Sequence, residues 1–251
     1  SDLASLQTRG EVDGEEIVIN GQKIWTTGGH FADWMHALVR TNPDAPKKQG
    51  GISMVLIDLK TPGISIRPIM TIADDEEFSE VFFDDARIPF SNLVGELNDG
   101  WSVAKALLAS ERIGNANPQL ALQCLDKLQR VARATGTIND PVFQDNLNKL
   151  ELDVLAQSAV FAHAIQQAKA GMDIGAGSSF MKIVATENIQ RIADLMFEAA
   201  GQHAADVEPM VTDEGPVDVS VLWREVRRIT IYAGSSEIQR NITAKRVLGL
   251  P

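Results

Sequence analysis

The sequence predicts an α+β protein of two domains: an antiparallel β-barrel-like domain followed by an antiparallel four/five-helix bundle. Two observations predict this class. Apolar and polar residues alternate along short segments up to about residue 95, whereas after Gly100 apolar residues recur at helical steps of three, four and seven. Turn clusters rich in Pro, Gly and Asn separate the short segments. We therefore expect a β-domain over residues 1–98 and a helical domain over residues 99–251.

Short strands are predicted in the first domain. The segment 16–19 (EIVI) is followed by Asn20-Gly21, a dipeptide typical of hairpin turns, so residues 22–25 are expected to form the returning strand. Further strands are expected at 34–41, 51–58, 64–68 and 80–84. Several short strands without helices between them indicate a barrel or a sandwich.

Helical segments are predicted in the second domain. Residues 101–133 are rich in Ala and Leu, and Pro118 is expected to kink or divide this helix. A second apolar stripe with helical spacing begins at Phe143. Ser236 and Gln239 are expected to form a capping box at the start of the last helix. The remaining helices are expected at 178–200, 220–231 and 236–248.

Composition and charge limit the classes of function. The chain has 251 residues, of which 44% are hydrophobic and 23% charged, and this composition excludes intrinsic disorder. The formal net charge of −11 makes nucleic acids and anionic membranes poor partners. The sequence has no apolar run of membrane-spanning length and no pattern of a secretory signal at its start. Together with the single cysteine, Cys124, these features predict a cytoplasmic protein.

Sequence motifs for metal or nucleophilic catalysis are absent. The sequence contains neither a Gly-x-Ser-x-Gly motif nor a phosphate-binding loop, so these two chemistries have no candidate residues. No metal site is expected, because none of the histidines is paired at metal-ligand spacing. The four histidines are His30, His36, His163 and His203.

Three segments resemble signatures of the acyl-CoA dehydrogenase family. Residues 20–29 (NGQKIWTTGG) resemble a signature of the family's middle domain, and residues 80–89 (EVFFDDARIP) resemble the last strands of that domain. Residues 232–242 (YAGSSEIQRNI) resemble its C-terminal helix. Because the three occur in the family's order, the chain is identified as a member over essentially its whole length. The resemblance implies a further N-terminal helical domain that this chain lacks, and we expect the chain alone to be inactive.

The resemblance implies an oxidoreductase of fatty acid metabolism. Such an enzyme uses FAD to dehydrogenate an acyl-CoA thioester to a trans-2-enoyl-CoA and passes the electrons to an electron-transferring flavoprotein. A homo- or hetero-oligomer of acyl-CoA dehydrogenase subunits is expected. Two alternatives remain open: a non-catalytic structural subunit of a mixed oligomer, and an acyl-CoA oxidase of the same fold.

Five residues match cofactor-binding positions of the family. Trp25 and Thr27, with Thr26 between them, match a segment that lies along the flavin ring. There an aromatic side chain shields the ring from water, and a hydroxyl or N–H group can form a hydrogen bond with flavin N5. Ser235 and Glu237 match positions that contact the phosphate-ribose part of the cofactor. Without the resemblance, Trp25 would be interpreted as a core residue and Ser235 as a helix cap.

Four residues match positions at the substrate. Ser1, Arg112 and Gly234 match residues that lie near the acyl-CoA. Many members have their catalytic glutamate where this chain has Ala233, which cannot accept a proton. Glu111 matches the position that a minority of members use instead, and we expect it in a cleft between the domains, facing the flavin-binding threonines. The alternative is a solvated Glu111–Arg112 pair on a helix surface.

Three residues depart from the family's pattern. Members usually have an arginine and, three residues later, a phenylalanine that reach the flavin of a neighbouring subunit, but this chain has Thr135 and Ile138 there. Phe197 occupies the position of a cofactor-contacting glutamine. These departures favour an assembly in which another polypeptide supplies the missing cation.

Overall fold

The structure is a computed structural model that describes residues 2–172, 174–175 and 177–250, with residues 109–113 described by their backbone only. The chain divides into two compact units, Ser1–Leu108 and Ala109–Pro251. Strands dominate the first unit and helices the second, which confirms the predicted class and the order of its parts. Three finer points stay predictions: that the sheet closes into a barrel, that the helices form one bundle, and that the domain boundary lies at residue 98.

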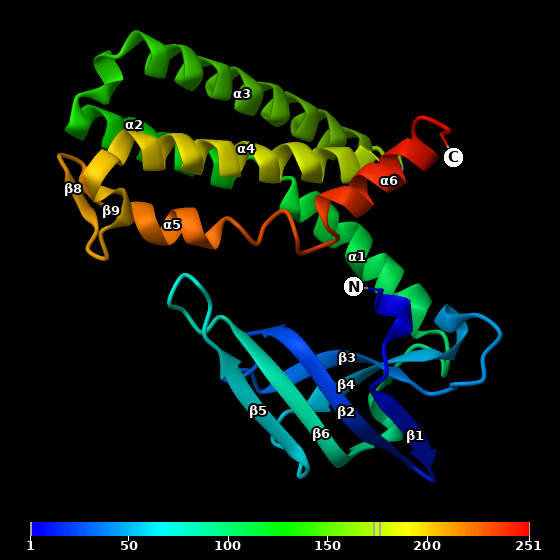
Figure 1. Cartoon of the computed structure of the whole chain (residues 1–251). Coiled ribbons are helices and arrows are strands. Elements are labelled where there is room, and N and C mark those ends of the chain that lie inside the picture. Colours follow the sequence, from blue (N-terminus) through cyan, green and yellow to red (C-terminus); the bar gives the residue numbers. More distant parts are fainter. Residues whose placement is uncertain (1, 173, 176, 251) are drawn as a thin grey trace. The chain divides into compact units, whose positions relative to one another are not determined.

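A seven-stranded sheet forms the first unit (Figure 1). Neighbouring strands are antiparallel except for β1 and β3, which are parallel, and the order is β5-β6-β2-β1-β3-β4-β7. The strands predicted at 34–41, 51–58 and 64–68 are confirmed to within one residue, and 80–84 is the middle of a longer strand. The strands are β1 (Arg9–Asp13), β2 (Glu16–Thr27), β3 (Trp34–Arg40), β4 (Ile52–Asp58), β5 (Ile64–Ile69), β6 (Phe78–Pro89) and β7 (Leu93–Val94), and the short 3₁₀ helices are η1 (Leu3–Ser5), η2 (Lys48–Gly51) and η3 (Phe90–Asn92).

The sheet carries apolar residues on both faces of β3 and β4. Val39 and Val55 lie in the main core of the unit, whereas Leu38 and Met54, one residue away, lie in a second cluster. This follows from the alternation of side chains along a strand. The second cluster includes Ala104 from the start of α1 (Gly100–Asn115), so the first turns of this helix cover that face of the sheet.

The hairpin predicted at Asn20-Gly21 is wrong, because β2 runs through these residues. The register of β2 against β6 shifts between Ile19 and Gly21, as in a β-bulge. Gly21 has a φ of 124°, and a Cβ on it would lie 3.0 Å from the Cα of Thr8. The hairpin turn lies earlier, at Gly14, whose φ is 61° and which joins β1 to β2. The Asn-Gly pair therefore indicated a position where the backbone needs glycine, but the structure there is a bulge and not a turn.

Helices make up most of the second unit, and α4 packs against α2, α3, α5 and α6 (Figure 1). Pro118 divides the first predicted helix, as expected, because α2 begins directly after it. Asp140 caps α3 by accepting hydrogen bonds from the backbone N–H groups of Val142 and Phe143. The elements are α2 (Gln119–Thr135), η4 (Thr137–Asn139), α3 (Pro141–Lys169), α4 (Gly177–Ala200), η5 (Gly201–Ala205), β8 (Met210–Thr212), β9 (Gly215–Val217), α5 (Val219–Glu225) and α6 (Ser236–Arg246).

Two features of this unit differ from the prediction. The helix expected at 220–231 is shorter, since α5 ends at Glu225, and the small hairpin of β8 and β9 precedes it without having been predicted. One apolar core joins α2, α3, α4 and α5, and it contains Leu128, Val154 and Met196. Among the described residues, no helix is both long enough and apolar enough to cross a membrane.

Candidate functional site

A pocket of about 540 Å³ lies in the first unit. Its walls come from β2, β3, β4 and the first turns of α1. Most of the lining is apolar and includes Leu38, Met54 and Leu107, while Thr26 and Thr27 of β2 are also part of the wall. The structure thus brings two of the predicted cofactor-binding residues to a mostly apolar pocket, the usual surroundings of a small-molecule site.

Trp25 lies beside these threonines with its side chain largely in solvent. The side chain is 60% exposed, which rules out the core position that the sequence alone would suggest. Its φ of 62° is in the left-handed region, and the register of β2 against β6 shifts between Lys23 and Thr26. The indole ring meets the ring of Phe78 edge to face, with centroids 5.9 Å apart. An exposed, edge-supported aromatic ring next to two threonines is a surface that a planar ligand can cover.

Lys23 is a functional candidate that the sequence analysis missed. It lies on the pocket wall, partly buried, and its Nζ donates a hydrogen bond to the carbonyl oxygen of Leu38 at 2.6 Å. Burial lowers the pKa of Lys23 to about 8. Period-two alternation along β2 could have placed Lys23 on a covered face, but the Asn-Gly turn prediction interrupted that pattern.

In the variant Lys23→Met, the free energy of unfolding is expected to increase less steeply with pH between pH 8 and 10.5 than in the unsubstituted protein. Between pH 8 and the ordinary lysine value of 10.5, the unfolded chain holds this proton and the folded chain releases it, so the free energy of unfolding rises with pH. The slope of the free energy of unfolding against pH should decrease by at most about 1.4 kcal/mol per pH unit, the contribution of one released proton. Urea unfolding of the purified protein across this range measures it. Lys47→Met, at an exposed lysine, is the control, and equal slopes in Lys23→Met and the unsubstituted protein would disprove the assignment.

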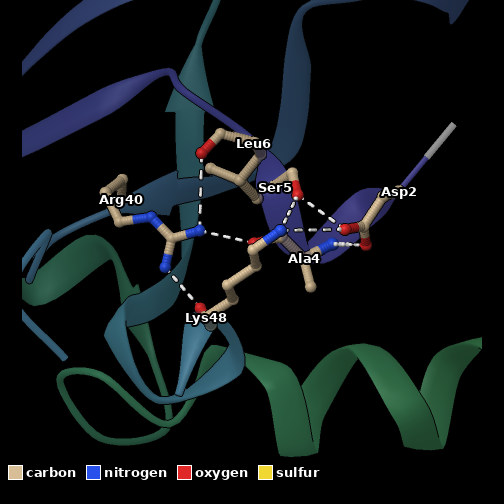
Figure 2. A network of polar contacts seen from close by, with 6 residues as sticks. All are labelled: Asp2, Ala4, Ser5, Leu6, Arg40 and Lys48. Atoms are coloured by element: carbon tan, nitrogen blue, oxygen red, sulfur yellow. Dashed lines mark hydrogen bonds and ion pairs between the residues drawn. The ribbon is translucent and has the colours of Figure 1, made fainter. Parts of the chain in front are cut away.

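Figure 2 shows how the N-terminal segment is fastened to the sheet. The Arg40 guanidinium donates to the carbonyl oxygens of Ala4 at 2.6 Å and Leu6 at 3.4 Å. Lys48 contacts the Ser5 hydroxyl at 2.9 Å and the Asp2 carboxylate at 3.5 Å. The hydrogen bond from Ser5 is the main cause that lowers the pKa of Asp2.

The fastened segment also reaches the pocket, because Leu3 is part of its wall. Ser1, the predicted substrate-binding residue, directly precedes this segment but lies outside the residues that the structure describes.

The start of α6 carries the predicted residues of the second unit. The Ser235 hydroxyl accepts a hydrogen bond from the backbone N–H of Ile238 at 3.5 Å and so caps the helix. Glu237 lies in the first turn, where a hydrogen bond from its own backbone N–H and another with Ser235 lower its pKa. Gly234 has a φ of 84°, and a Cβ on it would lie 2.4 Å from Nε2 of Gln239. The helix start therefore requires glycine at this position.

The predicted capping box of Ser236 and Gln239 is wrong. The cap is Ser235, and the Gln239 side chain instead donates to the carbonyl oxygens of Ala233 at 2.9 Å and Gly234 at 3.3 Å. The Ser236 hydroxyl and Oε1 of Gln239 are buried and have no hydrogen-bond partner. Buried polar atoms are nearly always paired, so these two atoms are suited to a polar ligand group at the start of α6.

The predicted base and its neighbour belong to α1, but the Glu111 and Arg112 side chains lie outside the described residues. Thr135 ends α2, and its hydroxyl contacts the hydroxyl of Thr137 at 2.8 Å. Ile138 packs against the helical core. Phe197 packs against Trp223, with ring centroids 5.1 Å apart.

Each unit by itself fits a part of a flavin dinucleotide. In the first unit, the exposed indole of Trp25 and the pocket-lining Thr26 and Thr27 fit a planar ring. In the second unit, unpartnered buried polar atoms lie at the start of α6, where backbone N–H groups favour anionic groups. Among the described residues, no three His, Cys, Asp or Glu side chains gather as metal ligands would.

Comparisons with known proteins give matches over nearly the whole chain. Residues 1–86 match the family model described as acyl-CoA dehydrogenase, middle domain, and residues 98–248 match the one described as acyl-CoA dehydrogenase, C-terminal domain. The chain is 37% identical over 254 residues to acyl-CoA dehydrogenase IpdE1 of Mycobacterium tuberculosis, with 100% of this chain and 64% of that protein covered. It is 35% identical to acyl-CoA dehydrogenase FadE34 of the same organism, covering 100% of this chain and 34% of that protein. The chain therefore spans less than two thirds of the length of these relatives.

Two solved structures share the fold of the whole chain. One is titled "Tcur3481-Tcur3483 steroid ACAD", with a TM-score of 0.89 and 28% identity over 100% of this chain and 65% of that chain. The other is the ChsE4-ChsE5 complex from Mycobacterium tuberculosis, with a TM-score of 0.84 and 29% identity over 100% of this chain and 66% of that chain.

Proposed function

The chain belongs to the acyl-CoA dehydrogenase family, and from this premise we propose that the complete protein oxidises an acyl-CoA thioester to a trans-2-enoyl-CoA. The observation that carries the proposal is the placement of Thr26 and Thr27 on a mostly apolar pocket beside the exposed Trp25. This arrangement lies in the segment 20–29, whose sequence is similar to the family's middle-domain signature. We also propose that residues 1–98 act as the barrel-like middle domain and residues 99–251 as the helical bundle.

The residues of the chain have separate parts in this reaction. When bound, FAD supplies the acceptor for the hydride that leaves the β-carbon of the substrate. Trp25 shields the flavin ring from water, and Thr26 and Thr27 offer hydrogen bonds to its edge. Ser235 and Glu237 bind the phosphate-ribose part of the cofactor at the start of α6.

Glu111 is the proposed base, which removes the proton from the carbon next to the thioester. Loss of water from around a carboxylate raises its pKa and makes it a stronger base. Ser1, Arg112 and Gly234 bind the acyl-CoA in this proposal. We propose an electron-transferring flavoprotein as the electron acceptor and the cytoplasm as the compartment. The single cysteine, Cys124, is buried and unpaired, as in reducing compartments.

An absorption spectrum of the complete protein tests the function. We expect the oxidised flavin band to bleach under anaerobic conditions when a panel of straight-chain, branched and ring-bearing acyl-CoA thioesters is added, because the substrate's hydride reduces the flavin. A protein without flavin, or a flavin that no thioester bleaches, would contradict the proposal. Oxygen consumption during turnover would identify an oxidase.

A second function is favoured by specific residues. Ala233 cannot act as a base, and neither Thr135 nor Ile138 can supply the cation that a dinucleotide requires. The titles of two matched structures each name a pair of polypeptides. A structural subunit of a mixed acyl-CoA dehydrogenase oligomer is therefore the alternative, and it predicts that the complete protein binds a flavin-carrying homologue without turning over substrate itself.

A further inference from the structure

Lys182 of α4 places an ammonium group inside the helical unit. Its side chain is 0% exposed, and its Nζ donates a hydrogen bond to the carbonyl oxygen of Gly234 at 3.0 Å. Burial lowers the pKa of Lys182, while the carboxylates of Glu237 and Glu187 act in the opposite direction. Burying a charged group is unfavourable unless it has a partner, so a lysine at this core position stabilises the fold less than an apolar residue would.

The carbonyl that Lys182 holds belongs to an unusual turn. Ala233 and Gly234 are both in the left-handed region, with φ values of 52° and 84°. The left-handed region is unfavourable for a residue with a Cβ, such as Ala233, so surrounding contacts must impose this conformation. Gln239 of α6 donates hydrogen bonds to the carbonyl oxygens of both residues, and Lys182 of α4 donates a further one to that of Gly234.

Helix α4 fastens the segment between α5 and α6 at a second point. The Gln190 side chain donates to the carbonyl oxygen of Val226 at 2.9 Å and to the Thr230 hydroxyl at 3.2 Å. Gln190 therefore secures the beginning of the segment, and Lys182 secures its end, where α6 starts.

We propose that Lys182 is a positioning residue, which fixes the turn 232–237 and thereby aims the N-terminus of α6 at the bound ligand. The proposal rests on the proposed function, in which Gly234, Ser235 and Glu237 bind substrate and cofactor. In this proposal Lys182 does not touch the ligand, because its side chain is fully buried and its Nζ donates to the backbone of the turn. Its role is exerted through the Gly234 carbonyl.

The hydrogen bonds of the turn indicate that Lys182 can be replaced without unfolding the protein, so its effect on the turn can be measured separately. If Lys182 is replaced by methionine, the Gly234 carbonyl keeps the Gln239 amide as a partner at 3.3 Å. Methionine has a similar volume and carries no charge, so the substitution also removes the desolvation cost of a buried ammonium group. The variant is therefore expected to fold while its turn loosens.

Hydrogen exchange of the complete protein without added FAD measures the turn directly. In Lys182→Met, the backbone amides of residues 232–239 are expected to exchange about 10-fold faster, and FAD to bind about 10-fold more weakly, as expected for the loss of a charged hydrogen bond. Lys182→Gln, which keeps a neutral donor, is expected to restore part of both effects. Thr186→Val is the matched control, because Thr186 is buried on the same helix and its hydroxyl donates to the helix's own carbonyls, those of Lys182 and Ile183.

Normal exchange at residues 232–239 in Lys182→Met would overturn the proposal, as would equal loosening in Thr186→Val. If Lys182→Met does not fold, the exchange rates of Lys182→Gln decide in the same way: wild-type rates overturn the proposal and intermediate acceleration supports it. A complete protein that binds no flavin would instead refute the proposed function, and the exchange rates would still decide whether Lys182 holds the turn.

Discussion

Replacement of Glu111 by glutamine is expected to lower the turnover of the complete protein about 10²-fold or more, the usual scale for removal of a positioned base. FAD content should not change, because the amide has nearly the shape of the carboxylate. The expectation follows from the proton balance of the proposed reaction: a base must take the α-proton, and Ala233 at the usual position cannot do so. Glu111 belongs to α1 and is the glutamate that we propose as the base.

Exchange of the substrate's α-hydrogen with solvent measures the action of the base without requiring oxidation of the substrate. A thioester analogue that cannot be oxidised should exchange its α-hydrogen with deuterated water in the unsubstituted protein and not in Glu111→Gln. Glu198→Gln, at a glutamate of α4, is a control that should leave both exchange and turnover unchanged. Normal turnover of Glu111→Gln would reject Glu111 as the base.

The sequence correctly predicted the elements that are specified by signals in their own residues, such as an apolar run or a proline. The strand at 34–40 is a short, mostly apolar run that ends just before the turn residues 42–46, and it was placed within one residue. Pro118 marked the division between two helices because it cannot continue one. The strand β1 was missed because four of its five residues are exposed, so it has almost no apolar pattern. Asn20-Gly21 predicted a hairpin where the chain has a bulge, because both structures require a residue that tolerates positive φ.

The candidate site was predictable to the extent that its residues form short local motifs. The resemblance directed attention to Thr26 and Thr27, which line the pocket, and to Ser235, which caps α6. Lys182 was missed, although its neighbours Ala185 and Thr186, one turn along α4, are both buried and helical spacing could have placed it on the buried face. Its partner Gly234 is 52 residues away in the chain, and such a pairing is set by tertiary packing.

The second large effect concerns the cation that the dinucleotide requires. The pyrophosphate of FAD carries about two negative charges, and each charge-assisted hydrogen bond to such a group is roughly twice as strong as a neutral one. The Thr135 hydroxyl donates to the carbonyl oxygen of Val131 in its own helix at 3.2 Å, and Ile138 packs against the helical core. Neither residue therefore offers a positive charge to the pyrophosphate in the proposed site of a neighbouring copy.

We expect the complete protein to bind FAD about 10- to 100-fold more weakly when expressed alone than with a homologous subunit that supplies the cation, as follows from the loss of about 1.5–3 kcal/mol of charged hydrogen bonding. Co-expression, mass measurement of the assembly and flavin counting should show a mixed oligomer with fewer flavins than chains. The double substitution Thr135→Arg with Ile138→Phe should restore FAD binding in the homo-oligomer. The exposed Thr135 can accept an arginine, and a cation is favourable at the end of a helix.

Asn139→Arg places the same charge four residues further along, at another exposed position, and is the control for a general effect of charge. It should leave FAD binding as weak as in the unsubstituted protein, because its guanidinium is not at the position that reaches a neighbour's cofactor. One tightly bound FAD per chain in a homotetramer of the unsubstituted protein would rule out the mixed assembly. In that case the phosphates would be held by helix N-termini and water, and the start of α6, with its unpartnered Ser236 hydroxyl, would be the first place to look for them.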